Sequence, residues 1–387
     1  MSRVVIAGGG FAGVSALKTL AKTPENNKGE IEISLIDKKP YFEFLPMLPD
    51  VAGGWLGPER LRQELKELAS LSNANFIHDR IEKLDLEKKN ITTTGQDIPY
   101  DHLILATGSE TNFYGNNQLQ NTCAHIDTVA DAVSVLESMP KKNTPEETNI
   151  VVVGGGYTGI EVASNLDILL KKNNIKHRTY IVEQAKEALM TLPEWMRDEV
   201  NKELLKLGIE TMCGRSVKEY DGGTVTLYSG ETFRNAVCIW AAGVKTPQFI
   251  EDAGFPAERS RVVVDQNLRP AGNKIKDVFV AGDTAYFEYT EDGKPLRMAV
   301  MFSMGEGKTA ARNVINSIKG KPLAEYRPLD LGYLIPVANG NAPGKVLGLN
   351  IHGFSGYLMH YFMCIYRAEP AKRWGIIKDI FFKISKK

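Results

Sequence analysis

Short apolar runs rich in β-branched residues recur along this chain, and helical patterns separate several of them. In the first third, such runs lie at residues 1–6, 31–36 and 100–106, with a helical pattern at 13–22. The order returns further on, with runs at 150–153 and 179–183 around a helical pattern at 159–171. A last run at 278–281 precedes a helical pattern at 305–318. Strands that alternate with helices in this way predict an α/β fold.

A glycine-rich turn follows the first strand of each repeat, and an acid stands 24 residues after the third glycine in both copies. The residues are Gly8, Gly10, Gly13 and Asp37 in the first copy, and Gly154, Gly156, Gly159 and Glu183 in the second. The first glycine permits a tight turn, the second lets the backbone approach a pyrophosphate, and the third lets the helix pack on the strand. The helix N-terminus attracts the phosphate charge. One such fingerprint is weak evidence, but two with matching offsets predict two dinucleotide sites in one chain.

The acid at the end of the second strand indicates which nicotinamide cofactor is used. A carboxylate there accepts a hydrogen bond from a ribose 2′-hydroxyl and repels a 2′-phosphate. Glu183 therefore favours NADH over NADPH. The alternative interpretation is that both glycine clusters are ordinary strand-to-helix turns, which the paired offsets disfavour.

Composition excludes several classes of function. A chain of 387 residues suggests two or three domains, and 47 basic against 47 acidic residues give no global field for nucleic acid. The four cysteines form no CxxC pair, and neither they nor the six histidines show metal-ligand spacing. No apolar run reaches the roughly 18 residues that span a bilayer. We therefore expect no metal site, no nucleic-acid partner and no membrane-spanning helix.

The order of motifs resembles that of flavoproteins with two dinucleotide-binding domains. Over about the first 320 residues, the order is the first fingerprint, YDHLILATGS, the second fingerprint, IWAAGV, and NLRPAGNKIKDVFVAGDTA. Closer cues are YFEFLPMLPDVAGG, Glu161 within GGGYTGIEVA, and an aromatic, basic tail. With these the chain resembles type II NADH dehydrogenases, which are single-subunit, non-pumping NADH:quinone oxidoreductases. The resemblance implies two Rossmann-like domains in a glutathione-reductase-like arrangement, followed by a C-terminal membrane-associating helical segment.

The resemblance also implies a domain plan and a reaction. Residues 1–117 and 255–325 would form an FAD-binding domain, 118–254 an NADH-binding domain, and 326–387 a C-terminal membrane-surface or dimer segment. A hydride would pass from NADH to the flavin, and two electrons would pass on to a membrane quinone. The protein would then lie peripherally on the cytoplasmic face of a membrane.

The same resemblance assigns roles to particular residues. The FAD set would be Gly8, Gly10, Phe11, Ala12, Gly13, Asp37, Lys38, Ala106, Thr107, Gly108, Gly282 and Asp283. The NADH set would be Gly154, Gly156, Tyr157, Thr158, Gly159, Glu183, Ala242 and Gly243. Glu161 would be the catalytic residue that orients the nicotinamide carboxamide. The local alternatives are a helix N-cap for Asp283 and a solvated residue near the helix start for Glu161.

The tail and the acceptor side are less uniform. Trp374, Ile377, Ile380, Phe381 and Ile384 recur at helical spacing, and residues 367–387 carry a net charge of +5. Such a helix suits an anionic membrane surface. The alternative is a helix docked on the protein body or in a homodimer. The family's quinone-side glutamines are replaced by Met301 and Gly305, which flank Phe302, so the acceptor is the least defined part of the assignment.

Two other functions compete with this prediction. A sulfide:quinone oxidoreductase has a similar length and tail, but it needs a redox cysteine near the second fingerprint, where residues 154–163 have none. A non-respiratory NADH:acceptor reductase, or a flavin-bearing interaction protein, would keep both fingerprints and use the tail for docking.

Overall fold

The computed structural model describes residues 1–142, 146–272, 275–289 and 293–385, and it divides into two compact units. Unit 1 comprises residues 1–42, 63–110 and 244–330, and unit 2 comprises residues 43–62, 111–243 and 331–387. Four short strands fall where the chain passes from one unit to the other, namely β3 (Tyr41–Glu43), β4 (Arg62–Glu64), β10 (Glu110–Thr111) and β19 (Val244–Lys245).

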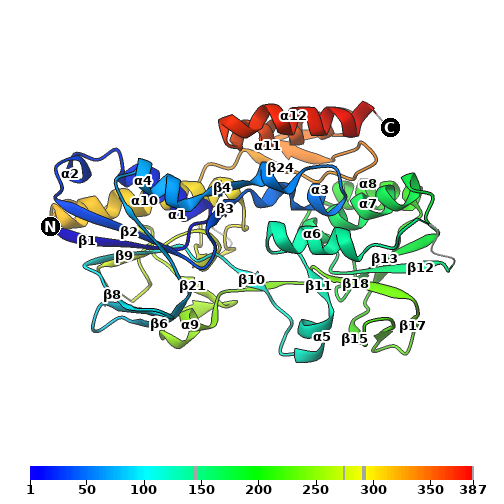
Figure 1. Cartoon of the computed structure of the whole chain (residues 1–387), viewed down its shortest axis with the longest axis horizontal. Helices are drawn as coiled ribbons and strands as arrows, with labels where there is room; N and C mark the ends of the chain where they lie inside the picture. Colours follow the sequence, from blue (N-terminus) through cyan, green and yellow to red (C-terminus); the bar gives the residue numbers. More distant parts are fainter. Residues whose placement is uncertain (143–145, 273–274, 290–292, 386–387) are drawn as a thin grey trace. The chain divides into compact units, whose positions relative to one another are not determined.

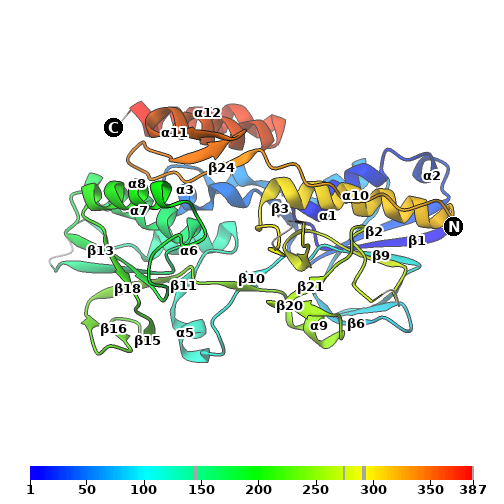
Figure 2. The ribbon, with the colours of Figure 1, turned by 180° about the vertical axis from the view of Figure 1, so that it is seen from behind.

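Unit 1 is built on a parallel sheet in the order β22-β9-β1-β2-β5. Its strands are β1 (Ser2–Ala7), β2 (Ile31–Asp37), β5 (Asn75–His78), β9 (His102–Leu105) and β22 (Val278–Val280). Its helices are α1 (Phe11–Leu20), α2 (Pro24–Asn27), α4 (Leu65–Leu71), α9 (Gln248–Asp252), α10 (Val300–Ile318) and the short η3 (Gly282–Thr284). Helices α1 and α10 lie along one face of this sheet (Figures 1 and 2).

Two small sheets complete unit 1 on the other side of its parallel sheet (Figure 1). They are β6 (Ile81–Asp85), β7 (Asn90–Thr93) and β8 (Asp97–Pro99), and β20 (Ala257–Glu258), β21 (Arg261–Val263) and β23 (Ala285–Tyr286). Most of β1 and all of β9 and β22 are buried, as expected for central strands of a parallel sheet that is covered on both faces.

Unit 2 repeats the plan with the order β11-β18-β12-β13-β14, all parallel. Its parallel strands are β11 (Ala124–His125), β12 (Thr148–Val153), β13 (His177–Glu183), β14 (Glu210–Cys213) and β18 (Ala236–Trp240). Its helices are η1 (Leu45–Met47), α3 (Leu48–Ala52), η2 (Pro58–Leu61), α5 (Asn117–Thr122), α6 (Val129–Ser138), α7 (Tyr157–Lys172), α8 (Glu194–Leu207), α11 (Gly353–Arg367) and α12 (Pro370–Ser385). Its antiparallel sheets are β15 (Val217–Tyr220), β16 (Val225–Leu227) and β17 (Thr232–Phe233), and β24 (Gly332–Leu334), β25 (Gly344–Val346) and β26 (Leu349–Ile351).

The predicted α/β class with two dinucleotide-binding sheets is confirmed, and so is a helical C-terminal segment. The strand that carries each glycine fingerprint lies at the centre of its sheet, so its carboxyl end opens at the middle of the sheet edge. Three predicted helix starts are late: α1 begins at Phe11, α7 at Tyr157 and α10 at Val300, rather than at residues 13, 159 and 305. Gly305 is tolerated inside α10 because the ring of Tyr326 fills the space of its missing side chain, at 3.1 Å from the position of a Cβ.

Candidate functional site: two nucleotide turns and a buried charged cluster

The turn after β1 has the backbone geometry that the first fingerprint predicts. Gly8 has a φ of +106°, and a Cβ on Gly13 would lie 1.8 Å from the carbonyl oxygen of Gly8. Helix α1 therefore packs on its strand at a distance that only glycine allows. A Cβ on Gly10, the first residue before α1, would meet nothing within 4 Å, so the side of the turn where a pyrophosphate is expected is open.

Asp37 closes this turn from the end of β2. Its carboxylate accepts hydrogen bonds from the amides of Gly9, at 2.6 Å, and Lys39, at 2.8 Å. A carboxylate offers about four acceptor positions, so two amide bonds leave room for ribose hydroxyls. The neighbouring Phe11 ring packs edge-to-face against the Phe42 ring, and Ala12 is buried.

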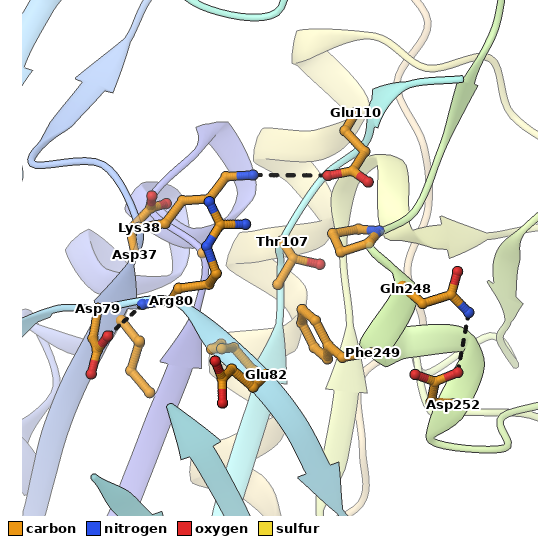
Figure 3. Close-up of a pocket in the computed structure, with 14 residues that line it drawn as sticks. Asp37, Lys38, Asp79, Arg80, Glu82, Thr107, Glu110, Gln248, Phe249 and Asp252 are labelled. Atoms are coloured by element: carbon orange, nitrogen blue, oxygen red, sulfur yellow. Dashed lines mark hydrogen bonds and ion pairs between the residues drawn. The ribbon is translucent and has the colours of Figure 1, made fainter. Parts of the chain in front are cut away.

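A cavity of about 440 Å³ opens at this edge of unit 1. Gly8, Asp37, Lys38 and Thr107 line it together with Arg80 and Phe249, which the sequence did not single out. Figure 3 shows Lys38 and Arg80 among the residues that line the cavity, and the Lys38 ammonium reaches Glu110 at 3.8 Å. The glycine turn, the two cations and the Phe249 ring suit the adenosine and phosphate part of a dinucleotide, although five carboxylates also line the cavity, namely Asp37, Asp79, Glu82, Glu110 and Asp252.

Two further turns of unit 1 meet at the same edge. Thr284 accepts a hydrogen bond from the amide of Gly108 at 2.9 Å, and Thr107 contacts the Thr284 hydroxyl at 3.3 Å. Asp283 accepts a hydrogen bond from Ser109 at 3.2 Å, and burial raises the pKa of its carboxyl. Ala106 is buried and donates its amide to the Ala7 carbonyl, which ties β9 to β1.

The second fingerprint repeats the first within unit 2. Gly154 has a φ of +111°, and a Cβ on Gly159 would lie 1.9 Å from the Gly154 carbonyl oxygen. Gly156 is the residue before α7, and a Cβ added to it would meet nothing within 4 Å. Thr158, two residues later, is exposed. Glu183 accepts hydrogen bonds from the amide of Gly155, at 2.6 Å, and from that of Ala185, at 2.7 Å.

The rest of the predicted NADH set lies on neighbouring parts of unit 2. Tyr157 stacks edge-on against Tyr333. The Ala242 carbonyl accepts a hydrogen bond from the Trp240 indole, and Gly243 has a φ of +80° beside the Tyr114 ring. The structure thus brings the second fingerprint and the turn after β18 to one edge of the second sheet.

A buried charged cluster lies behind α7 and was not predicted. The Lys383 ammonium donates to Asp50 at 2.6 Å, to Tyr361 at 2.8 Å and to Asn165 at 2.9 Å. Tyr361 also donates to Asp50, at 2.7 Å. The side chains of Lys383 and Asp50 are only 1% and 5% exposed, so all three ammonium protons are satisfied out of contact with water.

Glu161 belongs to the surroundings of this cluster. It lies on α7 one turn before Asn165, whose amide donates to the Glu161 carbonyl at 2.9 Å. Burial and the charge of Asp50 raise the pKa of Glu161 well above its ordinary value, although Lys383 opposes the shift. Glu161 is half-buried, so it is not fully solvated as the local alternative supposes. Burial opposes the charge on Lys383, but Asp50 and Tyr357 raise its pKa.

The predicted quinone-side residues lie in the first turns of α10. Phe302 is buried, whereas Met301 is half-buried. The Tyr326 hydroxyl donates to the Phe302 carbonyl at 3.3 Å, and its ring occupies the side-chain space at Gly305. A longer side chain at position 305 would have to displace that ring.

The predicted apolar stripe of α12 is not one face. Ile380 is 4% exposed and packs inward with Ile376, whereas Trp374, Ile377 and Phe381 are exposed. Ile384, the last member of the stripe, lies outside the residues whose side chains the structure describes. The positive charge of Lys383 also points inward, so it does not belong to the basic surface that the net charge suggested. Among the described helices, none has the length and apolarity needed to cross a bilayer.

The side chains that sequence reasoning missed share one signal. Asp50, Lys383 and Glu306 are single charges within apolar or small-residue stretches, namely LPMLPDVAGG, IFFKIS and FSMGEG. Charges inside such stretches are buried only with partners, which is a reason to search for those partners. In the described part of the chain, no group of three or more His, Cys, Asp or Glu side chains is arranged to hold a metal ion.

Comparison with known proteins adds a family and several similar chains. Residues 2–307 match the family described as pyridine nucleotide-disulphide oxidoreductase. A type II NADH:quinone oxidoreductase from Staphylococcus saprophyticus is 24% identical over 371 residues, and the match covers 91% of each chain. The corresponding protein of Staphylococcus haemolyticus is 25% identical over 370 residues, again with 91% of each chain covered.

Solved structures show the same fold. NDH2 from Plasmodium falciparum, solved in complex with NADH, has a TM-score of 0.85 at 17% identity and covers 98% of this chain and 97% of its own. The sulfide:quinone oxidoreductase of Aquifex aeolicus has a TM-score of 0.79 at 19% identity, covering 98% of this chain and 92% of its own. At such identities these likenesses establish the fold alone.

Proposed function

Because this chain belongs to the pyridine nucleotide-disulphide oxidoreductase family, we propose that it is an FAD-dependent NADH:quinone oxidoreductase. The observation that carries the proposal is the presence of two complete nucleotide turns, one in each compact unit, each closed by an acid bonded to its middle glycine. One chain with two such sites is suited to electron transfer between two cofactors. The named relatives, which match over 91% of the chain, are type II NADH:quinone oxidoreductases.

Unit 1 is the FAD site of this proposal. The open side of Gly10, the cations Lys38 and Arg80, and the carboxylates Asp37 and Asp283 supply what a flavin dinucleotide requires. The amides at the start of α1 and the two cations hold the phosphates. The carboxylates of Asp37 and Asp283 accept hydrogen bonds from the ribose and ribityl hydroxyls. The bound flavin supplies two-electron chemistry, and the protein supplies binding and orientation.

Unit 2 is the NADH site. The Glu183 carboxylate accepts hydrogen bonds from the hydroxyls of the adenosine ribose, and its charge disfavours a 2′-phosphate. The open side of Gly156 faces the pyrophosphate. Glu161 is the residue that orients the nicotinamide carboxamide. Burial raises the pKa of its carboxyl well above the ordinary value, which favours the neutral form, and that form can both donate and accept a hydrogen bond.

The C-terminal helices are the membrane contact. On α11, Phe354, Leu358, Phe362 and Tyr366 form an exposed stripe at four-residue spacing. On α12, Trp374, Ile377, Phe381 and Phe382 are exposed, whereas Ile376, Ile380 and Lys383 hold the helix on unit 2. One face of α12 therefore docks and the other is exposed, which suits a peripheral protein whose acceptor is dissolved in lipid.

The reaction is tested with purified protein under anaerobic conditions. NADH should bleach the flavin absorbance, and a short-chain quinone should restore it. Protein that carries no flavin and cannot take up FAD would contradict the proposal. Bleaching by sulfide but not by NADH would instead support a sulfide:quinone oxidoreductase. Reoxidation by soluble acceptors but by no quinone would support a non-respiratory NADH:acceptor reductase.

The membrane contact is tested with a triple variant, Phe362→Ser, Trp374→Ser and Phe381→Ser, which removes exposed rings and leaves the docking face intact. It should bind anionic vesicles more weakly than wild type and reduce a long-chain quinone more slowly, while ferricyanide reduction by NADH is kept. Tyr228→Ser is the matched control, because Tyr228 is an exposed ring elsewhere on unit 2. A triple variant that binds vesicles normally but changes from dimer to monomer would assign the face to a homodimer.

A further inference from the structure

A buried acid of unit 1 has no part in the functions described so far. Glu306 lies on α10, is only 3% exposed, and accepts a hydrogen bond from the amide of Gly282 at 2.6 Å. Gly282 begins η3, the short turn that carries Asp283 and Thr284. A buried carboxyl is costly unless it is bonded or neutral, so its presence here calls for a role.

The position of Glu306 links this turn to the first fingerprint. The next residue, Gly307, packs so closely on α1 that a Cβ there would lie 2.1 Å from the carbonyl oxygen of Ala12. A Cβ on Gly282 would likewise lie 3.1 Å from that of Ala12. Glu306 is thus held where the first turn of α1 and the turn of Asp283 meet. Both are parts of the proposed FAD site.

We propose that Glu306 is a positioning residue for FAD, which fixes the turn of Asp283 against the start of α1 and whose neutral form is favoured by bound FAD. This inference rests on the proposed assignment of FAD to unit 1. The hydrogen bond from Gly282 holds the turn whether Glu306 is neutral or charged, because a carboxyl oxygen accepts in both forms. Only the neutral form avoids placing another negative charge beside the site of a pyrophosphate.

The charges around Glu306 support this balance. Asp283 faces it from η3 and raises its pKa, Arg261 faces it from β21 and lowers it, and the Tyr326 phenol lies near it from the loop after α10. The face of α1 at this contact presents the uncharged Ala12. Burial is the largest influence, and it raises the pKa of Glu306 to about 8.

The sign of the pH dependence follows from linkage. A bound pyrophosphate adds negative charge and excludes water, so FAD raises the pKa of Glu306 further. FAD affinity is then full below about pH 8 and falls as the pH rises from the pKa of the free site toward that of the occupied site. Within that range, each pH unit lowers the affinity by up to about tenfold, because one proton is bound together with FAD.

The test uses the FAD-loaded protein and follows the fluorescence of FAD released on dilution, from pH 6.5 to pH 9.5, at constant ionic strength. Wild type should lose FAD progressively above about pH 8. Glu306→Gln keeps the acceptor oxygen for Gly282 but cannot ionise, so it should hold FAD with little dependence on pH. Glu306→Ala loses the acceptor and, like Glu306→Gln, cannot ionise, so it should release FAD about tenfold more readily than Glu306→Gln at every pH.

Glu87→Gln is the matched control, because Glu87 is an exposed acid of the same unit and its loss changes the net charge equally. It should show the wild-type profile. The inference is overturned if Glu306→Gln keeps the wild-type pH dependence, or if Glu306→Ala binds FAD like Glu306→Gln. A wild-type protein that binds no FAD at pH 7 would instead overturn the proposed function itself, so the two failures are distinct.

Discussion

The two nucleotide-binding units have the same backbone geometry at the glycine turn, but different charged side chains surround it. In each unit the acid that ends the second strand bonds the amide of the glycine 28 residues earlier, Gly9 in one case and Gly155 in the other. In each unit a Cβ on the third glycine would lie less than 2 Å from the carbonyl oxygen of the first. The repeated features are therefore those that backbone geometry imposes on any nucleotide turn.

The difference lies in the ionisable side chains behind each turn. Behind the turn of unit 1 stands a single buried acid, Glu306, partly balanced by Arg261. Behind α7 of unit 2 stands a paired ion, Lys383 with Asp50, and Glu161 lies in the field of both. Duplicated turns explain how two nucleotides bind. The unlike charges behind them are where the two units differ.

The largest effects should come from the third glycines. Gly159→Ala forces α7 away from its strand, since its Cβ would lie 1.9 Å from a carbonyl oxygen, and it should abolish bleaching of the flavin by NADH while FAD is retained. Gly13→Ala should do the converse and yield protein without flavin. Absorbance spectra before and after anaerobic NADH measure both.

The two variants test the assignment of cofactors to units. If Gly159→Ala lost FAD and Gly13→Ala kept it, the assignment would be reversed. Gly10→Ala and Gly156→Ala are the controls for folding, because a Cβ at either position meets nothing within 4 Å. These two controls should fold normally even where they weaken binding of the nucleotide.

The next largest effect concerns the paired ion of unit 2. Lys383→Met leaves Asp50 buried and unpaired, and it should lower the free energy of unfolding by about 3–5 kcal/mol, measured with urea. Lys383→Met with Asp50→Asn should recover much of the loss. The control is Arg60→Met, which breaks the half-exposed pair with Asp379 on the same helix and should cost at most about 1 kcal/mol. If Lys383→Met lowered the free energy of unfolding by no more than Arg60→Met does, water would have to reach the buried cluster.

The sequence predicted what is local in the chain. Both fingerprints, the strands that bear them and the acids 24 residues after each third glycine form as expected, because turn, strand and helix signals lie within one stretch. The sequence did not predict what depends on distant residues. Lys383 and Asp50 are 333 positions apart, and neither has a partner in its own element.

The departures at the tail and at α10 have the same cause. The spacing of α12 placed Ile380 with Trp374 and Phe381, but contacts with the rest of unit 2 bury Ile380 and leave the other two exposed. The helical pattern was placed from residue 305 onward, yet Gly305 lies inside the helix, where Tyr326, which is 21 residues away, fills its side-chain space. Helical periodicity identifies the helix, whereas the surrounding structure decides which face is covered.

A smaller effect is expected from replacing Glu183 or Asp37, the two acids that close the turns, because each should change the binding of one cofactor. Glu183→Ser removes the charge that opposes a 2′-phosphate, and it should narrow the preference for NADH over NADPH by about tenfold, or about 1.4 kcal/mol. Asp37→Ser should weaken FAD binding by a similar amount and leave that preference unchanged. Flavin reduction at varied NADH and NADPH, together with flavin content, measures both. If the preference responded to Asp37 and not to Glu183, the comparison between the units would fail.

The smallest effect at pH 7 is expected for Glu161→Gln. Burial raises the pKa of the Glu161 carboxyl and so favours its neutral form, which glutamine resembles because it keeps one acceptor and a donor in that place. Flavin reduction by NADH should therefore slow by about tenfold or less, the worth of one imperfect hydrogen bond, whereas Glu161→Ala should slow it further. Rapid mixing at pH 7 measures the rates of the three proteins. A Glu161→Gln variant slowed a hundredfold or more would mean that the reaction needs the charge of the Glu161 carboxylate. Equal rates for wild type and Glu161→Ala would reduce Glu161 to a structural residue of α7.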